Sequence, residues 1–94
     1  MGFTEAKKGV LKALADGTYQ HAARDQIDVK NELLTGTVTA GEIARVIRKC
    51  NGTHYTASPH HSDRSTTVHV LKRDDWYIKF YFIKEDTWFI SVHR

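Results

Sequence analysis

The last third of the chain, from Ser65 onward, alternates apolar and polar side chains in three runs that are separated by short charged turns. This period of two is typical of β-strands, because successive side chains of a strand point to opposite faces. In the middle run Trp76 and Ile78 face one side, whereas Tyr77 and Lys79 face the other. The sequence therefore predicts three consecutive antiparallel strands.

Pairing apolar with apolar residues gives an expected register, because a slip of one residue would turn each apolar set outward. This register places Val70 opposite Ile78 and Ile78 opposite Val92. In the last run, Trp88 and Ile90 are expected on the same core-facing side as Val92. The opposite side is then expected to gather His69, Tyr77, Lys79, Tyr81, Ser91 and His93.

Helices are predicted before these strands. The first is expected over residues 4–15, with Thr4 as its N-cap and Gly17 as its stop. The second is expected over about residues 20–34, ended by Gly36, with the option that it consists of two shorter pieces.

The third helix begins at a capping box, in which Thr39 caps the helix and Glu42 reaches back. A short strand is expected over 54–58, before Pro59. The order of elements predicts a single α+β domain over 1–94, with N-terminal helices packed on one face of a C-terminal antiparallel sheet.

Charge and cysteine content restrict the class of protein. The net charge is +3, and residues 48–94 carry eight Lys or Arg, five Asp or Glu and five of the six histidines. This bias favours a polyanionic partner. The lone Cys50 excludes an internal disulfide and is expected to be a small buried side chain. No apolar run approaches the roughly 20 residues of a membrane span. We therefore expect a cytoplasmic protein with no membrane partner.

The polar face of the predicted sheet carries the residue types that metal-free RNA cleavage requires. The set consists of His69, Tyr77, Lys79 and His93. Histidine transfers protons near neutral pH, and lysine offsets charge that develops on a phosphate. The plain alternative is an exposed sheet face that carries polar and aromatic residues without catalysis.

The loop before the first long strand contains His60, His61, Asp63 and Arg64. Histidine and aspartate can bind zinc, and a metal-dependent nuclease using His60, His61 and His69 is one alternative. The spacing matches no tight zinc motif, so we expect neither a metal nor another cofactor. The favoured interpretation is a solvated substrate rim in which Arg64 grips phosphate.

The order of these features resembles the MqsR family, small toxins of toxin–antitoxin pairs with a RelE-like ribonuclease fold. The resemblance rests on Gly36–Ile47, His54-Tyr55, Ser62-Asp63, Val70, Tyr77-Ile78-Lys79 and Phe89-Ile90-Ser91, and on the N-terminal helix that ends near Gly17. It covers most of the chain as a pattern, with few identities. The His60-His61 pair is also similar to that of HicA toxins, a class that the strand-rich C-terminus fits less well.

The resemblance implies metal-independent cleavage of messenger RNA and neutralisation by a cognate antitoxin. The family's active-site tyrosine falls on Tyr77, and a family lysine near the C-terminus falls on His93. A second family lysine falls on Thr56, which lacks its charge. A family glutamine falls near Val68 or His69, and the expected faces of the strand favour His69.

We therefore expect a cytoplasmic endoribonuclease toxin in which one of His69 and His93 acts as base and the other as acid. Lys79 offsets phosphate charge, and Tyr77 orients the phosphate or donates a proton. The residues expected to contact RNA are Thr56, His60, His61, Arg64, Arg73 and Tyr81. The alternative is a non-catalytic module that binds RNA or a protein through the same face.

Overall fold

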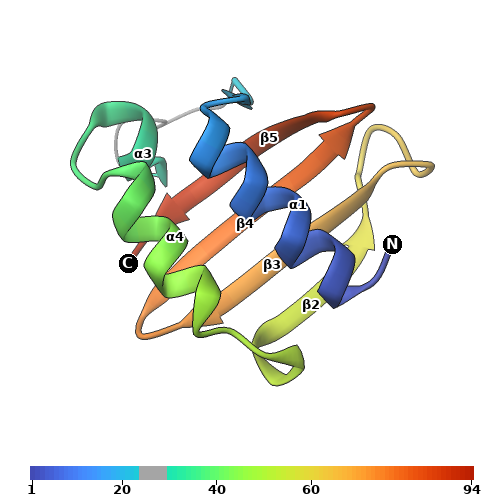
Figure 1. Cartoon of the computed structure of the whole chain (residues 1–94). Coiled ribbons are helices and arrows are strands. Elements are labelled where there is room, and N and C mark those ends of the chain that lie inside the picture. The colour runs from blue at the N-terminus through green and yellow to red at the C-terminus, as the bar shows by residue number, and fades with distance from the viewer. Residues whose placement is uncertain (24–29) are drawn as a thin grey trace.

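A computed structural model describes residues 1–23 and 30–94, and in this part of the chain five strands form one sheet in the order β1-β5-β4-β3-β2. The helices are α1 (Phe3–Asp16), α3 (Glu32–Thr35) and α4 (Ala40–Arg48), followed by the 3₁₀ helix η1 (Gly52–His54). The strands are β1 (Tyr19–His21), β2 (Tyr55–Pro59), β3 (Thr67–Arg73), β4 (Trp76–Ile83) and β5 (Asp86–His93). Figure 1 shows the antiparallel strands β2 to β5 behind the helices.

The first and third predicted helices are confirmed as α1 and α4. The capping box of α4 forms as expected, with the Thr39 hydroxyl accepting from the Glu42 amide and the Glu42 carboxylate accepting from the Thr39 amide. Gly17 ends α1 in the left-handed conformation at φ 73°. The Thr4 cap is wrong, because α1 begins one residue earlier and Gly2 occupies the N-cap position without a side-chain cap.

The second predicted helix is wrong at its N-terminal end and confirmed at its C-terminal end. Residues 19–21 form β1, which pairs in parallel with β5, so that the sheet is mixed rather than antiparallel. Only Glu32–Thr35 near the other end is α-helical, and Gly36 ends it at φ 84°. Residues 24–29 of the predicted helix lie outside the described residues. Tyr19 joins the sheet because its ring packs edge-on against that of Phe89 at 5.5 Å.

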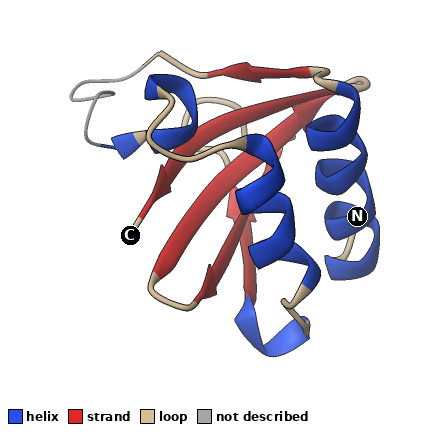
Figure 2. Cartoon of the chain, turned by 60° about the vertical axis from the view of Figure 1, so that its left-hand side comes forward, coloured by secondary structure: helices blue, strands red, loops and turns tan. Residues whose placement is uncertain are grey.

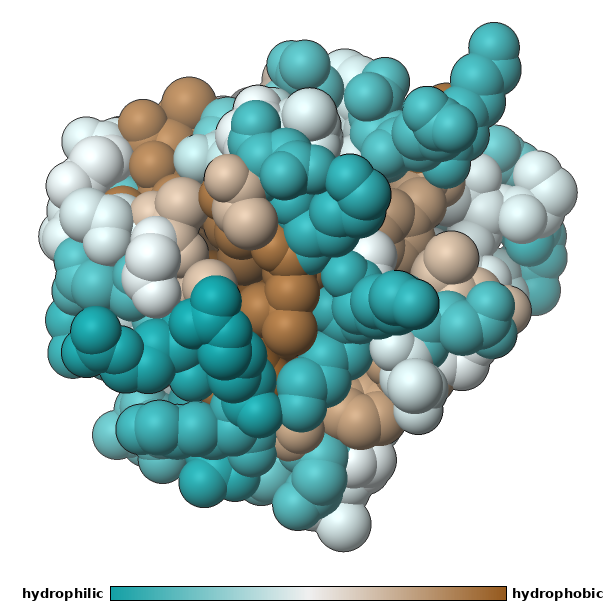
Figure 3. All heavy atoms as spheres, viewed as in Figure 1, coloured by the Kyte–Doolittle hydropathy of each residue, from teal (hydrophilic) through white to brown (hydrophobic). Residues whose placement is uncertain are grey.

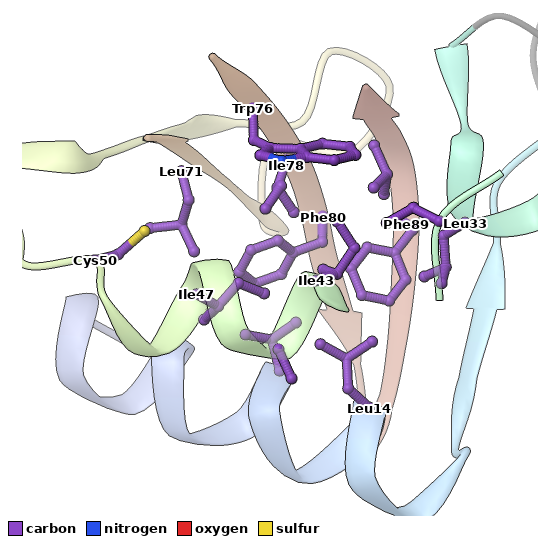
Figure 4. Packing of buried hydrophobic residues seen from close by; sticks show 14 of the residues in the cluster. Leu14, Leu33, Ile43, Ile47, Cys50, Leu71, Trp76, Ile78, Phe80 and Phe89 are labelled. Carbon is purple, nitrogen blue, oxygen red and sulfur yellow. The ribbon is translucent and has the colours of Figure 1, made fainter. Parts of the chain in front are cut away.

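The three helices lie on one face of the sheet, as the turned view in Figure 2 shows, and this confirms the α+β class. Polar side chains cover most of their outer side, and apolar residues appear in the gap between them (Figure 3). The core lies between these helices and the sheet (Figure 4). Its largest fully buried side chains include Phe80, Phe89, Ile43, Ile47 and Leu71. No helix among the described residues is long and apolar enough to cross a membrane.

The turn between β3 and β4 overturns the predicted register of that pair. Asp74 and Asp75 both have positive φ, 53° and 68°, and form a two-residue turn of the type whose twist suits a hairpin. Aspartate tolerates this conformation better than most side chains. The turn places Leu71, rather than Val70, opposite Ile78. It therefore shifts the expected pairing by one residue and reverses the faces of β3.

A β-bulge decides the faces of β5. The predicted pairs of Ile78 with Val92 and of Lys79 with Ser91 are confirmed, but Phe80 then pairs with Phe89. Ile90 is the additional residue on β5 between these two pairs. The bulge turns the fully buried Phe89 toward the helices, whereas Trp88 pairs with Tyr81 on the opposite face. The expected core position of Trp88 is therefore wrong.

Alanine substitution tests this bulge, because the two aromatic neighbours on β5 exchange their expected roles. Phe89→Ala should lower the free energy of unfolding by about 3–5 kcal/mol, the usual cost of deleting a buried aromatic ring. Trp88→Ala should lower it markedly less, because this ring is partly exposed. Denaturant unfolding of both variants provides the measurement. An equal or larger loss for Trp88→Ala would contradict the bulged register.

Candidate functional site

The sheet face opposite α1, α3 and α4, called here the open face, gathers the polar residues that the alternation selected. Cross-strand partners point to the same side of a sheet, so the register assigns its members. By this rule the open face of strands β2 to β5 comprises Thr56, Ser58, Val68, Val70, Lys72, Tyr77, Lys79, Tyr81, Ile83, Asp86, Trp88, Ser91 and His93. The expected grouping of Tyr77, Lys79 and His93 is therefore confirmed.

Tyr77 and His93 contact each other across β4 and β5 on this face. Their rings stack with centroids 5.4 Å apart and planes inclined by 26°. On the other side Lys72 places its ammonium group 5.4 Å from the centre of the Tyr77 ring. The register explains this arrangement, because Lys72 pairs with Tyr77 and Tyr77 pairs with His93. A cation, a phenol and an imidazole thus follow one another across three strands.

A hollow of about 240 Å³ lies beside this contact, lined by Lys30, Tyr77, Lys79, Ser91 and His93. Two ammonium groups at its wall favour an anion. The hydroxyl of Tyr77 and the imidazole of His93 add groups that can donate or accept a proton. The hollow therefore combines positive charge with acid–base chemistry.

The hydrogen bond of His93 bears on its proton chemistry. Its Nδ1 lies 3.3 Å from the main-chain oxygen of Arg94, to which a protonated Nδ1 donates. In the neutral ring this tautomer leaves the lone pair on Nε2. With this hydrogen bond, Nε2 is the nitrogen of neutral His93 that can accept a proton.

An aromatic series crosses the same face farther along the strands. Tyr81 and Trp88 have nearly parallel rings, inclined by 4°, with centroids 6.3 Å apart. His60 packs edge-on against Tyr81 at 5.3 Å and stacks on His61 at 4.8 Å. The expected position of His60 beside the face is thus confirmed, and its contact is with an aromatic ring.

His69 is not on the open face, which corrects the expected catalytic set. The shifted β3 register turns it toward the helices, where it is 1% exposed. Its ring lies 5.4 Å from those of Phe80 and Phe82, and its Nδ1 lies 2.7 Å from the Tyr55 hydroxyl. Burial lowers the pKa of His69, and the positive N-terminal amino group lowers it further. This histidine is part of the packed side of the sheet.

Arg73 also departs from its expected place at the RNA rim. Its Nη1 donates to the main-chain oxygen of Lys49 at 2.8 Å and lies 3.3 Å from Nε2 of His54. Asp74 is its salt-bridge partner at 3.6 Å. Arg73 therefore links the end of β3 to the segment that follows α4, on the helix side of the sheet.

The loop after β2 is held by one carboxylate. Asp63 accepts from the amide and hydroxyl of Ser65 and from the hydroxyl of Thr66, and these hydrogen bonds lower its pKa. Arg64 and His61 remain exposed beside it. Among the described residues, no three His, Cys, Asp or Glu side chains are grouped so as to hold a metal ion.

A larger hollow of about 540 Å³ lies between α1 and the β4–β5 hairpin. Its described lining contains no histidine, cysteine or tyrosine, and its Lys12 is paired with Asp16 at 2.6 Å. Cys50 is buried in the core, as expected, and burial raises the pKa of its thiol. Neither place offers the combination of groups found on the open face.

Three side chains of the open-face site were not selected from the sequence. Trp88 was assigned to the core because simple alternation does not reveal a bulge. The place of Lys72 on the open face follows once a two-residue turn is assumed at Asp74 and Asp75, and this pair of aspartates is compatible with such a turn. Lys30 approaches the hollow from another part of the chain, and no local signal indicates that contact.

The burial of His69 predicts a pH dependence of stability. Its pKa in the folded protein lies below the ordinary value of 6.5, so the unfolded chain binds a proton at higher pH than the folded protein. The free energy of unfolding should therefore fall as the pH is lowered through about 6.5. His21, whose pKa burial also lowers, should contribute in the same direction.

Denaturant unfolding between pH 8 and pH 5 measures this dependence. His69→Gln should be less stable at pH 8, because it loses packing against two phenylalanines, and its stability should change less with pH than that of the unaltered protein. Identical pH slopes for the two proteins would contradict the assignment.

Comparisons of this chain with protein-family models, with curated proteins and with solved structures find no match.

Proposed function

We propose that this protein is a metal-independent endoribonuclease that resembles the MqsR toxins and cleaves RNA on the open face. The observation that carries the proposal is the stacked pair of Tyr77 and His93 beside the lysine-lined hollow. RNA supplies both an anion for the lysines and an internal nucleophile, its 2′-hydroxyl. No group beyond these side chains is required.

In this mechanism Nε2 of neutral His93 removes the proton of the 2′-hydroxyl. The 2′-oxygen attacks the adjacent phosphorus, and the bond from phosphorus to the 5′-oxygen breaks. The Tyr77 hydroxyl donates its proton to the departing 5′-oxygen, and exchange with water restores both side chains. The products are a 2′,3′-cyclic phosphate and a 5′-hydroxyl. Such proton transfers typically contribute about 10²–10⁴-fold each.

The lysines stabilise the charge that grows on the phosphate oxygens during attack. Lys79 pairs across the strands with Ser91 at the hollow, and Lys30 lines the same hollow from outside the sheet. Lys72 lies over the far side of Tyr77 and adds positive charge there. This scheme assigns one histidine to the reaction, because His69 lies on the opposite face.

The same face supports a second candidate function, a non-catalytic module that binds RNA or a protein. The observation that favours it is the aromatic series of His60, Tyr81 and Trp88, which offers contact area without acid–base chemistry. For the toxin, we further propose a cognate antitoxin as protein partner and the cytoplasm as its location.

The cleavage proposal is tested by incubating the purified protein with RNA in the presence of a chelator and analysing the product ends. Fragments should end in 2′,3′-cyclic phosphate. His93→Ala should reduce the rate by about 10²–10⁴-fold, as expected for loss of a general base. Tyr77→Phe, which keeps the ring and its stacking, should reduce the rate through loss of the hydroxyl alone.

His54→Gln is the matched control, because this histidine lies on the helix side beside Arg73 and should retain full activity. Cleavage by His93→Ala at the normal rate would contradict the mechanism. RNA that stays intact both alone and in a translating extract would overturn the enzyme proposal and leave the binding module.

A further inference from the structure

We propose that Tyr81 and Trp88, flanked by His60, form a platform on which bases of a single-stranded RNA stack. The platform would hold the nucleotides next to the cleaved bond, and in this respect the inference rests on the proposed function. Its ability to bind bases does not require cleavage, so the two proposals can fail separately.

The geometry of the pair suits a flat ligand. The rings of Tyr81 and Trp88 are inclined by only 4° with centroids 6.3 Å apart, so that two parallel aromatic rings stack across two strands. His60 stands edge-on at one side of it, 5.3 Å from Tyr81. Stacking on aromatic side chains is the main way in which proteins bind unpaired bases without reading their sequence.

The platform lies at a useful distance from the proposed reaction centre. Tyr81 follows Tyr77 by four residues on β4, and both point to the open face. At about 3.3 Å per residue this separation is about 13 Å, within reach of a strand whose phosphate occupies the hollow. Lys79 lies between them and can contact the connecting backbone.

The charge of the surface between the two places fits a polyanion. Three cross-strand rows make up this area: Lys72–Tyr77–His93, Val70–Lys79–Ser91 and Val68–Tyr81–Trp88. These rows contain two lysines and a histidine, and none of their members is a carboxylate. RNA bases stack on aromatic rings, and phosphates bind to cations. The three rows provide both kinds of group, with Tyr77, Tyr81 and Trp88 as aromatic rings and Lys72 and Lys79 as cations.

Cross-strand aromatic pairs also stabilise sheets, so the position of Trp88 requires a separate argument. A bulge places it on the open face, and bulges often redirect a side chain next to a functional site. The bulge gives the core its phenylalanine at Phe89 and leaves the larger indole partly exposed.

Unpaired bases are the expected ligand because the platform needs access to a base plane. In a duplex both planes of an internal base are covered by its neighbours, whereas splayed bases of a single strand can stack on the protein. The proposal therefore excludes duplex RNA as the preferred ligand of this surface.

Trp88 can report on its own contact with RNA. The only other tryptophan, Trp76, is 9% exposed on the helix side, where Arg94 covers its ring. The Trp76→Phe protein then carries one tryptophan, at the platform. Titration with a single-stranded 2′-O-methyl oligonucleotide, which lacks the attacking hydroxyl, should quench its fluorescence. The same sequence as a duplex should quench it far less.

Affinity measurements with the same oligonucleotide test the stacking itself. Trp88→Leu and Tyr81→Leu should each weaken binding at least about fivefold, as expected for one stacked base, while Trp88→Phe should restore most of it. An oligonucleotide with abasic positions should lose the difference between Trp88→Leu and the unaltered protein. Thermal unfolding of each variant, at the temperature of the titration, shows that it remains folded.

Three outcomes would overturn the platform: unchanged fluorescence on binding, equal affinity of the folded Trp88→Leu variant, or equal binding of the duplex. A protein that binds and quenches as described but never cleaves would refute the nuclease and keep the platform. Cleavage that depends on His93 but is indifferent to Trp88→Leu would do the reverse.

Discussion

Strand β4 must serve two chemically different environments, and its two hairpin partners fix which side chains enter each. The left-handed turn at Asp74 and Asp75 sets the register of β3. The extra residue at Ile90 resets the register of β5 halfway along its length. Together these backbone features bring Phe80 and Phe89 into the core. Helices α1, α3 and α4 pack on the face that results.

The histidines of the two faces differ in exposure and therefore in the role that they can take. On the helix side His69 is enclosed by aromatic rings, and burial favours its neutral form. On the open side His93 is partly exposed, stacks on Tyr77 and lies among lysines. A single residue's difference in register separates a structural histidine from one available to a substrate.

The proposed reaction centre and the proposed stacking platform both depend on the rigidity of the central strands. Tyr77 and Tyr81 come from β4, and their partners His93 and Trp88 come from β5, so their spacing is fixed by the ladder. Groups on paired strands are held more precisely than groups on loops. Lys30 and His60 then approach this fixed surface from outside the sheet.

The sequence by itself determined the three C-terminal strands, the capped helix α4, the α+β class and the grouping of Tyr77, Lys79 and His93. These features follow from local alternation, capping chemistry and one correctly matched strand pair. Only the tertiary structure decided the strand β1, the faces of His69 and Trp88, and the position of Arg73, which binds Lys49 on the helix side of the sheet. Each of those depends on a partner distant in sequence or on a turn or bulge. Alternation alone does not decide the faces of β3, because buried apolar residues lie on both of them. Val68 and Val70 lie on one face and Leu71 on the other.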